Sequence, residues 1–76
     1  MKKYLDINGD SGVEAYDTGE DYISVLFKAG SARQYLYTNT VTGTHHVENM
    51  KKLAVNGNGL NSYINRNVKK NYANKT

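Results

Sequence analysis

The stretch from Tyr22 to Tyr37, YISVLFKAGSARQYLY, decides the fold. Its first six residues are β-branched, aromatic or aliphatic apart from one serine, a composition that favours a strand. A second strand is predicted over residues 33–38, which contain the Tyr35-Leu36-Tyr37 run. The glycine-containing segment between the runs is too short for a crossover connection, so the two strands are expected to be antiparallel. A weaker alternating run precedes them. The sequence therefore predicts an antiparallel meander with strands near 13–17, 22–28 and 33–38.

The first of these strands alternates only weakly. Because side chains point to opposite faces with a period of two, Val13 and Ala15 are expected on one face and Glu14 and Tyr16 on the other. A turn is expected at Asp17–Glu20.

Beyond residue 43 apolar residues recur every three or four positions, the spacing of an α-helix. A first helix is predicted with Thr44 as its N-cap and Asn56-Gly57 as its end, because glycine favours the left-handed position that closes helices. A second is predicted from about Leu60 to Tyr72. Its apolar stripe is Leu60, Ile64, Val68 and Tyr72, with Arg66, Lys69 and Lys70 on the opposite side.

The expected fold class is α+β: a three-stranded antiparallel β-meander packed on one face by two C-terminal helices. The 76 residues are expected to form a single domain. Within it, residues 1–10 are expected to be an N-terminal arm or edge strand, and residues 73–76 a frayed tail.

Composition excludes several classes of function. The chain has no cysteine, which excludes disulfides, thiolate nucleophiles and cysteine zinc sites. Its longest apolar runs, such as Val25–Phe27, have three residues, too few for a membrane span, and no apolar stretch follows the basic start as in a secretory signal. We therefore expect a soluble cytoplasmic protein.

Charge is unevenly distributed along the chain. Residues 1–27 carry a net charge of −4 and residues 28–76 a net charge of +7. A basic half can attract a polyanion such as nucleic acid, while the alternative is an ordinary solvated surface that keeps a small protein soluble.

Three short motifs occur in an order that resembles a known family. They are Val25-Leu26-Phe27 with Gly30, then Tyr35-Leu36-Tyr37, then Gly59, Asn65, Val68, Lys69 and Tyr72. Over residues 11–72 this order is similar to the KTSC domain, a short module named for the C-terminus of some lysyl-tRNA synthetases. Val68-Lys69 stands where the family has an Ile-Arg-like pair, and Thr38–Gly43 stands where many members have a proline. The family's function is not established, and the resemblance implies RNA binding, which has been suggested for it.

The register of the central hairpin decides where Tyr35 and Tyr37 point. A three-residue loop at 29–31 pairs Val25 with Tyr35 and places both tyrosines in the core. A two-residue loop pairs Val25 with Leu36 and places both outside, on the same face as Arg33, where they could stack on bases. The first register is favoured, and it leaves an apolar strip of Tyr22, Leu26 and Leu36 on the outer face.

Three further short segments could bind a ligand or could have a purely structural role. Asp6, Asn8 and Asp10 match the first oxygen positions of a calcium loop, but the position of its glycine is a serine, and an Asx-rich turn is favoured. His45-His46 at a helix start diverge by about 100°, so an exposed pair is expected rather than a chelate. Residues 56–59 precede a helix, where a phosphate could bind, but a simple helix–helix connector is favoured.

We predict a non-enzymatic binding module without a cofactor or metal, because no nucleophile–base–acid group or carboxylate pair is visible in the sequence. The first hypothesis is a nucleic-acid-binding module, for RNA or another polyanion, with a basic helical face. The alternative is a protein-interaction or self-associating module that uses the outer sheet face or an edge strand, with a second copy or another protein as partner. The residues predicted to contact nucleic acid are Arg33, Tyr35, Tyr37, Lys51, Lys52, Arg66, Lys69 and Lys70.

Overall fold

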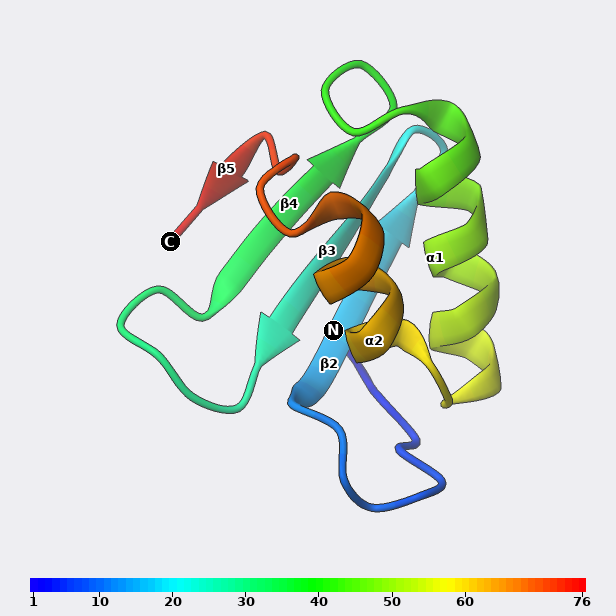
Figure 1. Cartoon of the computed structure of the whole chain (residues 1–76), viewed down its shortest axis with the longest axis vertical. Helices are drawn as coiled ribbons and strands as arrows, with labels where there is room; N and C mark the ends of the chain where they lie inside the picture. The colour runs from blue at the N-terminus through cyan, green and yellow to red at the C-terminus, as the bar shows by residue number, and fades with distance from the viewer.

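The computed structural model describes residues 1–76 as a five-stranded antiparallel sheet with helices on one side (Figure 1). The strands lie in chain order, β1-β2-β3-β4-β5. The α+β class is confirmed, but the sheet has five strands and not three. The elements are β1 (Lys2–Lys3), β2 (Val13–Gly19), β3 (Tyr22–Phe27), β4 (Gln34–Thr38), α1 (Thr44–Asn56), α2 (Leu60–Tyr63), the π-helical turn η1 (Ile64–Val68) and β5 (Asn74–Lys75).

The β3–β4 hairpin adopts the favoured register. Val25 lies opposite Tyr35, and Ile23 lies opposite Tyr37. Residues opposite each other share a face, so both tyrosines point to the same side as the buried Val25 and Ile23. Tyr37 is 1% exposed, whereas Tyr35 is only half-buried. This difference leaves Tyr35 at the rim of the core.

A β-bulge in β2 overturns the expected alternation of that strand. Val13 lies opposite Phe27, but the register shifts before Ala15, which lies opposite Leu26. The extra residue moves Ala15 to the outer face and turns Tyr16 inward. Val13 and Tyr16 therefore both belong to the main core cluster, while Ala15 is buried outside that cluster.

Both outer strands consist of two exposed, polar residues. β1 pairs Lys2 with Tyr16, so the N-terminal segment is an edge strand at its start. β5 pairs Lys75 with Tyr35, so residues 73–76 are not a frayed tail. Thr76 continues this pairing, because its carbonyl accepts the backbone N–H groups of Arg33 and Gln34.

The first helix has the expected length but a different start. Gly43, with φ of 107°, occupies the N-cap position, and Thr44 is the first helical residue and makes no cap hydrogen bond. Gly57 ends the helix in the left-handed conformation, as predicted. Val47, Met50 and Ala54 are its buried residues.

The second helix is shorter than predicted. Four α-helical residues are followed by five π-helical residues that end at Val68, so Tyr72 lies beyond the helix. The chain leaves the helix because other segments bind its backbone. The Thr42 hydroxyl donates to the Asn71 carbonyl, and the Ala73 N–H donates to the Leu36 carbonyl of β4. These bonds direct residues 71–76 along the sheet edge.

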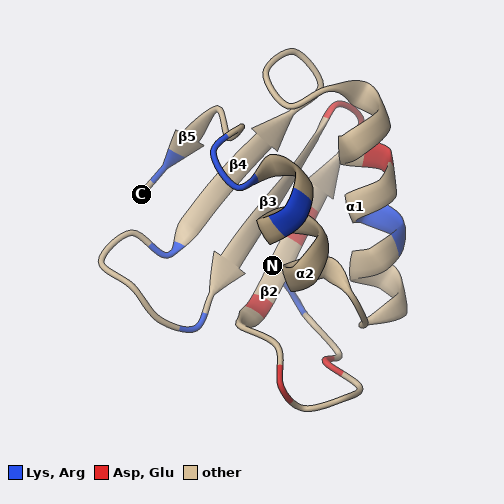
Figure 2. Cartoon of the chain, in the orientation of Figure 1, with Lys and Arg blue, Asp and Glu red and all other residues tan.

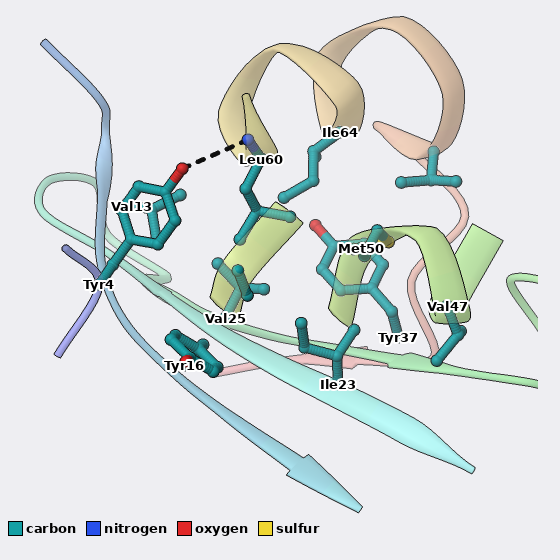
Figure 3. Close-up of a cluster of buried hydrophobic side chains, with 12 residues drawn as sticks. Tyr4, Val13, Tyr16, Ile23, Val25, Tyr37, Val47, Met50, Leu60 and Ile64 are labelled. Carbon is teal, nitrogen blue, oxygen red and sulfur yellow. Dashed lines mark hydrogen bonds between the residues drawn. The ribbon is translucent and has the colours of Figure 1, made fainter. Parts of the chain in front are cut away.

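One hydrophobic core joins the sheet to the helices (Figure 3). Ile23, Val25 and Tyr37 of the sheet face buried residues of α1, α2 and η1, among them Met50 and Leu60. Tyr4, which follows β1, is 2% exposed, and its hydroxyl accepts a hydrogen bond of 3.4 Å from the Leu60 N–H. The N-terminal segment is thereby attached to the start of α2.

No helix covers the opposite face of the sheet (Figure 1). Tyr22, Leu26 and Leu36 are half-buried there, as the favoured register predicts. The helices themselves are too short and too polar for any of them to cross a membrane.

Candidate functional site

A groove of about 570 Å³ lies where the sheet ends beside the second helix. One wall is formed by α2, η1 and the residues that follow them, and the other by β4, β5 and the loop that joins β3 to β4. The loop contributes Ala29–Ala32, four small residues whose side chains leave the space open.

Aromatic rings form the floor of this groove. Phe27 and Tyr35 meet edge to face at 5.3 Å between centroids, and Tyr35 and Tyr72 meet in the same way at 5.0 Å. All three are half-buried, so each packs partly against the core. Tyr37 lies beneath them, with its ring nearly parallel to that of Tyr35. Burial raises the pKa of Tyr37 well above its usual value, and it stays neutral.

Four lysines surround the aromatic floor, and no carboxylate lines the groove. The four are Lys28, Lys69, Lys70 and Lys75. Lys28 forms an ion pair of 3.1 Å with Asp6, while Lys69 and Lys70 are exposed and form no ion pair. A groove with one sign of charge concentrates ligands of the opposite sign.

Lys75 is held over an aromatic ring. Its Nζ lies 5.5 Å from the centroid of Tyr72, and hydrogen bonding with the Tyr72 side chain raises the pKa of Lys75. The ammonium group therefore stays charged beside the groove at neutral pH.

The structure separates the residues that were predicted to form one basic face. Tyr35, Lys69 and Lys70 line the groove. Arg33 is exposed at the end of the adjoining loop, where its carbonyl accepts the Phe27 N–H. Tyr37 also lines the groove, but it is 1% exposed, which excludes the role of an exposed stacking platform.

Three predicted contacts lie outside the groove. Lys51 donates to Glu48 at 2.9 Å and to the Glu20 carbonyl at 3.0 Å, so its charge is engaged by an acidic neighbour. Lys52 and Arg66 are exposed on α1 and η1, and neither lines the groove. Figure 2 shows the separation: Lys and Arg positions gather on β5, after η1 and at both ends of the β3–β4 loop, whereas α1 carries basic beside acidic positions.

Several groove residues were missed by sequence reasoning. Lys75 fell in the predicted tail, and Tyr72 in the stripe of a predicted helix. Lys28 and Asn61 belonged to no motif, and Asn65 was noted only as part of the family resemblance. The early end of the helix and the pairing of β5 with β4 place Tyr72 and Lys75 at the groove.

No family model, curated protein or solved structure matches this chain. The resemblance to the KTSC domain therefore stays a prediction.

The Asp6–Asp10 loop uses its polar groups within the protein. Asp6 accepts from the Ser11 N–H at 3.1 Å and from Lys28, and Asn8 donates to Asn58. Burial tends to raise the pKa of Asp6, but the bonds from Lys28 and Ser11 outweigh it and hold that pKa below its usual value. No group of three or more His, Cys, Asp or Glu side chains that could hold a metal ion is present.

The two histidines have separate partners. His45 is exposed and contacts Asn49, whereas His46 is half-buried and lies 2.7 Å from the Tyr63 hydroxyl. The expected pair of exposed histidines is thus wrong for His46, which joins α1 to α2. Residues 56–59 form the predicted connector, with both glycines left-handed.

Proposed function

We propose that this chain is a small non-enzymatic module that binds single-stranded nucleic acid in the groove, with RNA as the form implied by the KTSC resemblance. The observation that carries the proposal is the composition of the groove: three half-buried aromatic rings, four lysines and no carboxylate. The proposed interface is therefore the groove and not the helical face that contains Lys51 and Lys52.

The aromatic floor favours a single strand over a duplex. Bases in a duplex are stacked on one another, whereas the unpaired bases of a single strand can stack on protein rings, a contact worth about 1–3 kcal/mol per base. Tyr35 and Tyr72 supply such rings at the floor of the groove. Lysines at the rim supply the phosphate contacts that set affinity.

The lysines predict the salt dependence. For single strands, log K falls with log salt by about 0.7 for each phosphate that the protein neutralises. If all four groove lysines neutralise a phosphate, the slope is about −2.8, and affinity falls about 50-fold between 50 and 200 mM salt. Lys28 contributes less while it remains paired with Asp6.

A matched pair of double variants tests the location of the interface. Lys69→Gln/Lys70→Gln removes two charges from the groove, and Lys2→Gln/Lys3→Gln removes two adjacent charges from β1 at the opposite edge of the sheet. Fluorescence anisotropy of a labelled 12-nucleotide mixed-sequence RNA is measured from 50 to 200 mM salt. We expect the groove variant to bind more weakly with a slope smaller by about 1.4, and the β1 variant to keep the wild-type slope. No binding by wild type at 50 mM salt, or equal effects of the two variants, would overturn the proposal.

The uncovered face of the sheet supports a second candidate function, self-association. Tyr22, Leu26 and Leu36 form a half-buried apolar strip with no helix over it. Addition of a strand at either edge is less favoured, because each edge strand is only two residues long. Sedimentation velocity of wild type and of Leu36→Lys distinguishes a self-associating chain from a monomer. A dimer that forms with increasing concentration and is lost in the variant supports self-association, and a monomer throughout excludes it.

A further inference from the structure

We infer that the groove holds one unpaired base and contacts its hydrogen-bonding edge through Asn61 and Asn65. This inference rests on the proposed binding of a single strand and adds that two asparagines contact the hydrogen-bonding edge of one stacked base.

The two asparagines share one side of the second helix. They lie four residues apart in α2 and η1, a spacing that places side chains over the same surface, and both line the groove. Asn61 is half-buried and is accommodated by a glycine, because a Cβ on Gly12 would lie 3.3 Å from its Oδ1. Its position is therefore set by packing.

Both carboxamides have unused hydrogen-bonding capacity. Asn8, Asn49 and Asn67 all donate to protein acceptors, whereas Asn61 and Asn65 form no side-chain hydrogen bond with the protein. A carboxamide presents a donor and an acceptor side by side, which matches the paired donors and acceptors along the edge of a base. The groove thus has two unpaired groups suited to that edge.

The size and charge of the groove fit a nucleotide. Its volume of about 570 Å³ lies within the range of about 300–1,000 Å³ that is usual for sites that hold small ligands. A base against Tyr35 and Tyr72 would have the asparagines on one side and Lys69 and Lys70 near its phosphates. An acidic peptide would use the lysines but would leave the aromatic floor and the carboxamides unused.

The test compares a base-bearing strand with a strand that lacks bases. The probes are a fluorescein-labelled RNA nonamer of mixed sequence and a sugar–phosphate nonamer that is abasic throughout. We expect wild type to bind the RNA at least about tenfold more tightly than the abasic strand. In Asn61→Ala/Asn65→Ala this ratio should fall at least threefold while the salt slope is unchanged.

Asn67→Ala/Asn71→Ala is the control, because its residues have the same spacing, are exposed and do not line the groove. It should retain the wild-type ratio, and circular dichroism melts establish that both variants fold. A preference of wild type for the RNA that Asn61→Ala/Asn65→Ala leaves unchanged would overturn this inference and leave the proposed function standing, whereas equal binding of the abasic strand would overturn both. Displacement of the RNA by poly-glutamate as efficient as displacement by unlabelled RNA would identify an acidic peptide as the occupant and overturn both.

Discussion

Removal of the hydroxyl group from Tyr4 should lower stability, whereas its removal from Tyr37 should change stability little. Both tyrosines are buried, with 2% and 1% exposure. The Tyr4 hydroxyl accepts the Leu60 N–H at the start of α2, whereas the Tyr37 hydroxyl forms no hydrogen bond. The same change, tyrosine to phenylalanine, therefore removes a hydrogen bond within the protein in the first case and none in the second.

The two magnitudes follow from general hydrogen-bond energetics. A typical hydrogen bond contributes about 0.5–1.5 kcal/mol net, and a donor left buried without a partner costs more. Because the Tyr4–Leu60 bond is long, at 3.4 Å, we expect Tyr4→Phe to lower the free energy of unfolding by about 1 kcal/mol. For a domain of this size that is about 4–8 °C in Tm. Tyr37→Phe removes no hydrogen bond within the protein, and its hydroxyl is not a buried unpaired group, so Tm should change little.

Thermal melts followed by far-ultraviolet circular dichroism at pH 7 measure both changes. A second signature comes from alkaline pH, because burial raises the pKa of Tyr4 and of Tyr37. The unfolded chain then releases these protons first, so stability is retained below pH 10 and lost as the pH rises above it. As the pH rises above 10, the Tm of each variant should fall less than the Tm of wild type. An equal fall in Tm for both variants, or a larger fall for Tyr37→Phe, would refute this reasoning.

Two further predictions concern a close backbone contact at Gly57 and the charge of Asp6. Gly57 and Gly9 both have φ of 74°, but an added Cβ at Gly57 would lie 2.6 Å from the Leu5 Cβ, whereas at Gly9 it meets nothing. In urea unfolding, Gly57→Ala should therefore cost at least about 2 kcal/mol and Gly9→Ala about 1 kcal/mol; equal costs would show that Leu5 moves freely. The lowered pKa of Asp6 provides stability above the usual value of 3.8 that is lost as the pH falls. Asp6→Asn should thus flatten the fall of Tm between pH 5 and pH 3, and a curve parallel to wild type would contradict the role of its bonds to Lys28 and Ser11.

The elements with a strong apolar pattern could be predicted from the sequence. The β3–β4 register followed from the alternation of Ile23 and Val25 and from the glycine loop, because a one-residue slip would have buried the wrong face. The bulge before Ala15 could not be predicted, since it is one extra residue in a strand with weak alternation. β1 and β5 could not be predicted either, because two-residue polar strands contribute backbone hydrogen bonds and no side-chain pattern.

The candidate site was predictable only in part. Tyr35, Lys69 and Lys70 were recognised, but charge counting also included Lys51, which is engaged by Glu48. Helical periodicity continued to Tyr72, and nothing in the sequence indicated that Thr42 would bind the backbone after Val68 and end the helix early. The groove depends on that early end, and so its remaining residues required the three-dimensional structure.

The attachment of β5 also governs how the groove moves. Strands held at a sheet edge by a few backbone hydrogen bonds separate at a much lower free energy than central strands do. The amides of Ala73 and Thr76, which pair with β4, should therefore exchange with solvent deuterium far faster than those of β3. One wall of the groove can then swing outward while the core stays folded, and under the proposed function this would let a single strand enter from the side without threading.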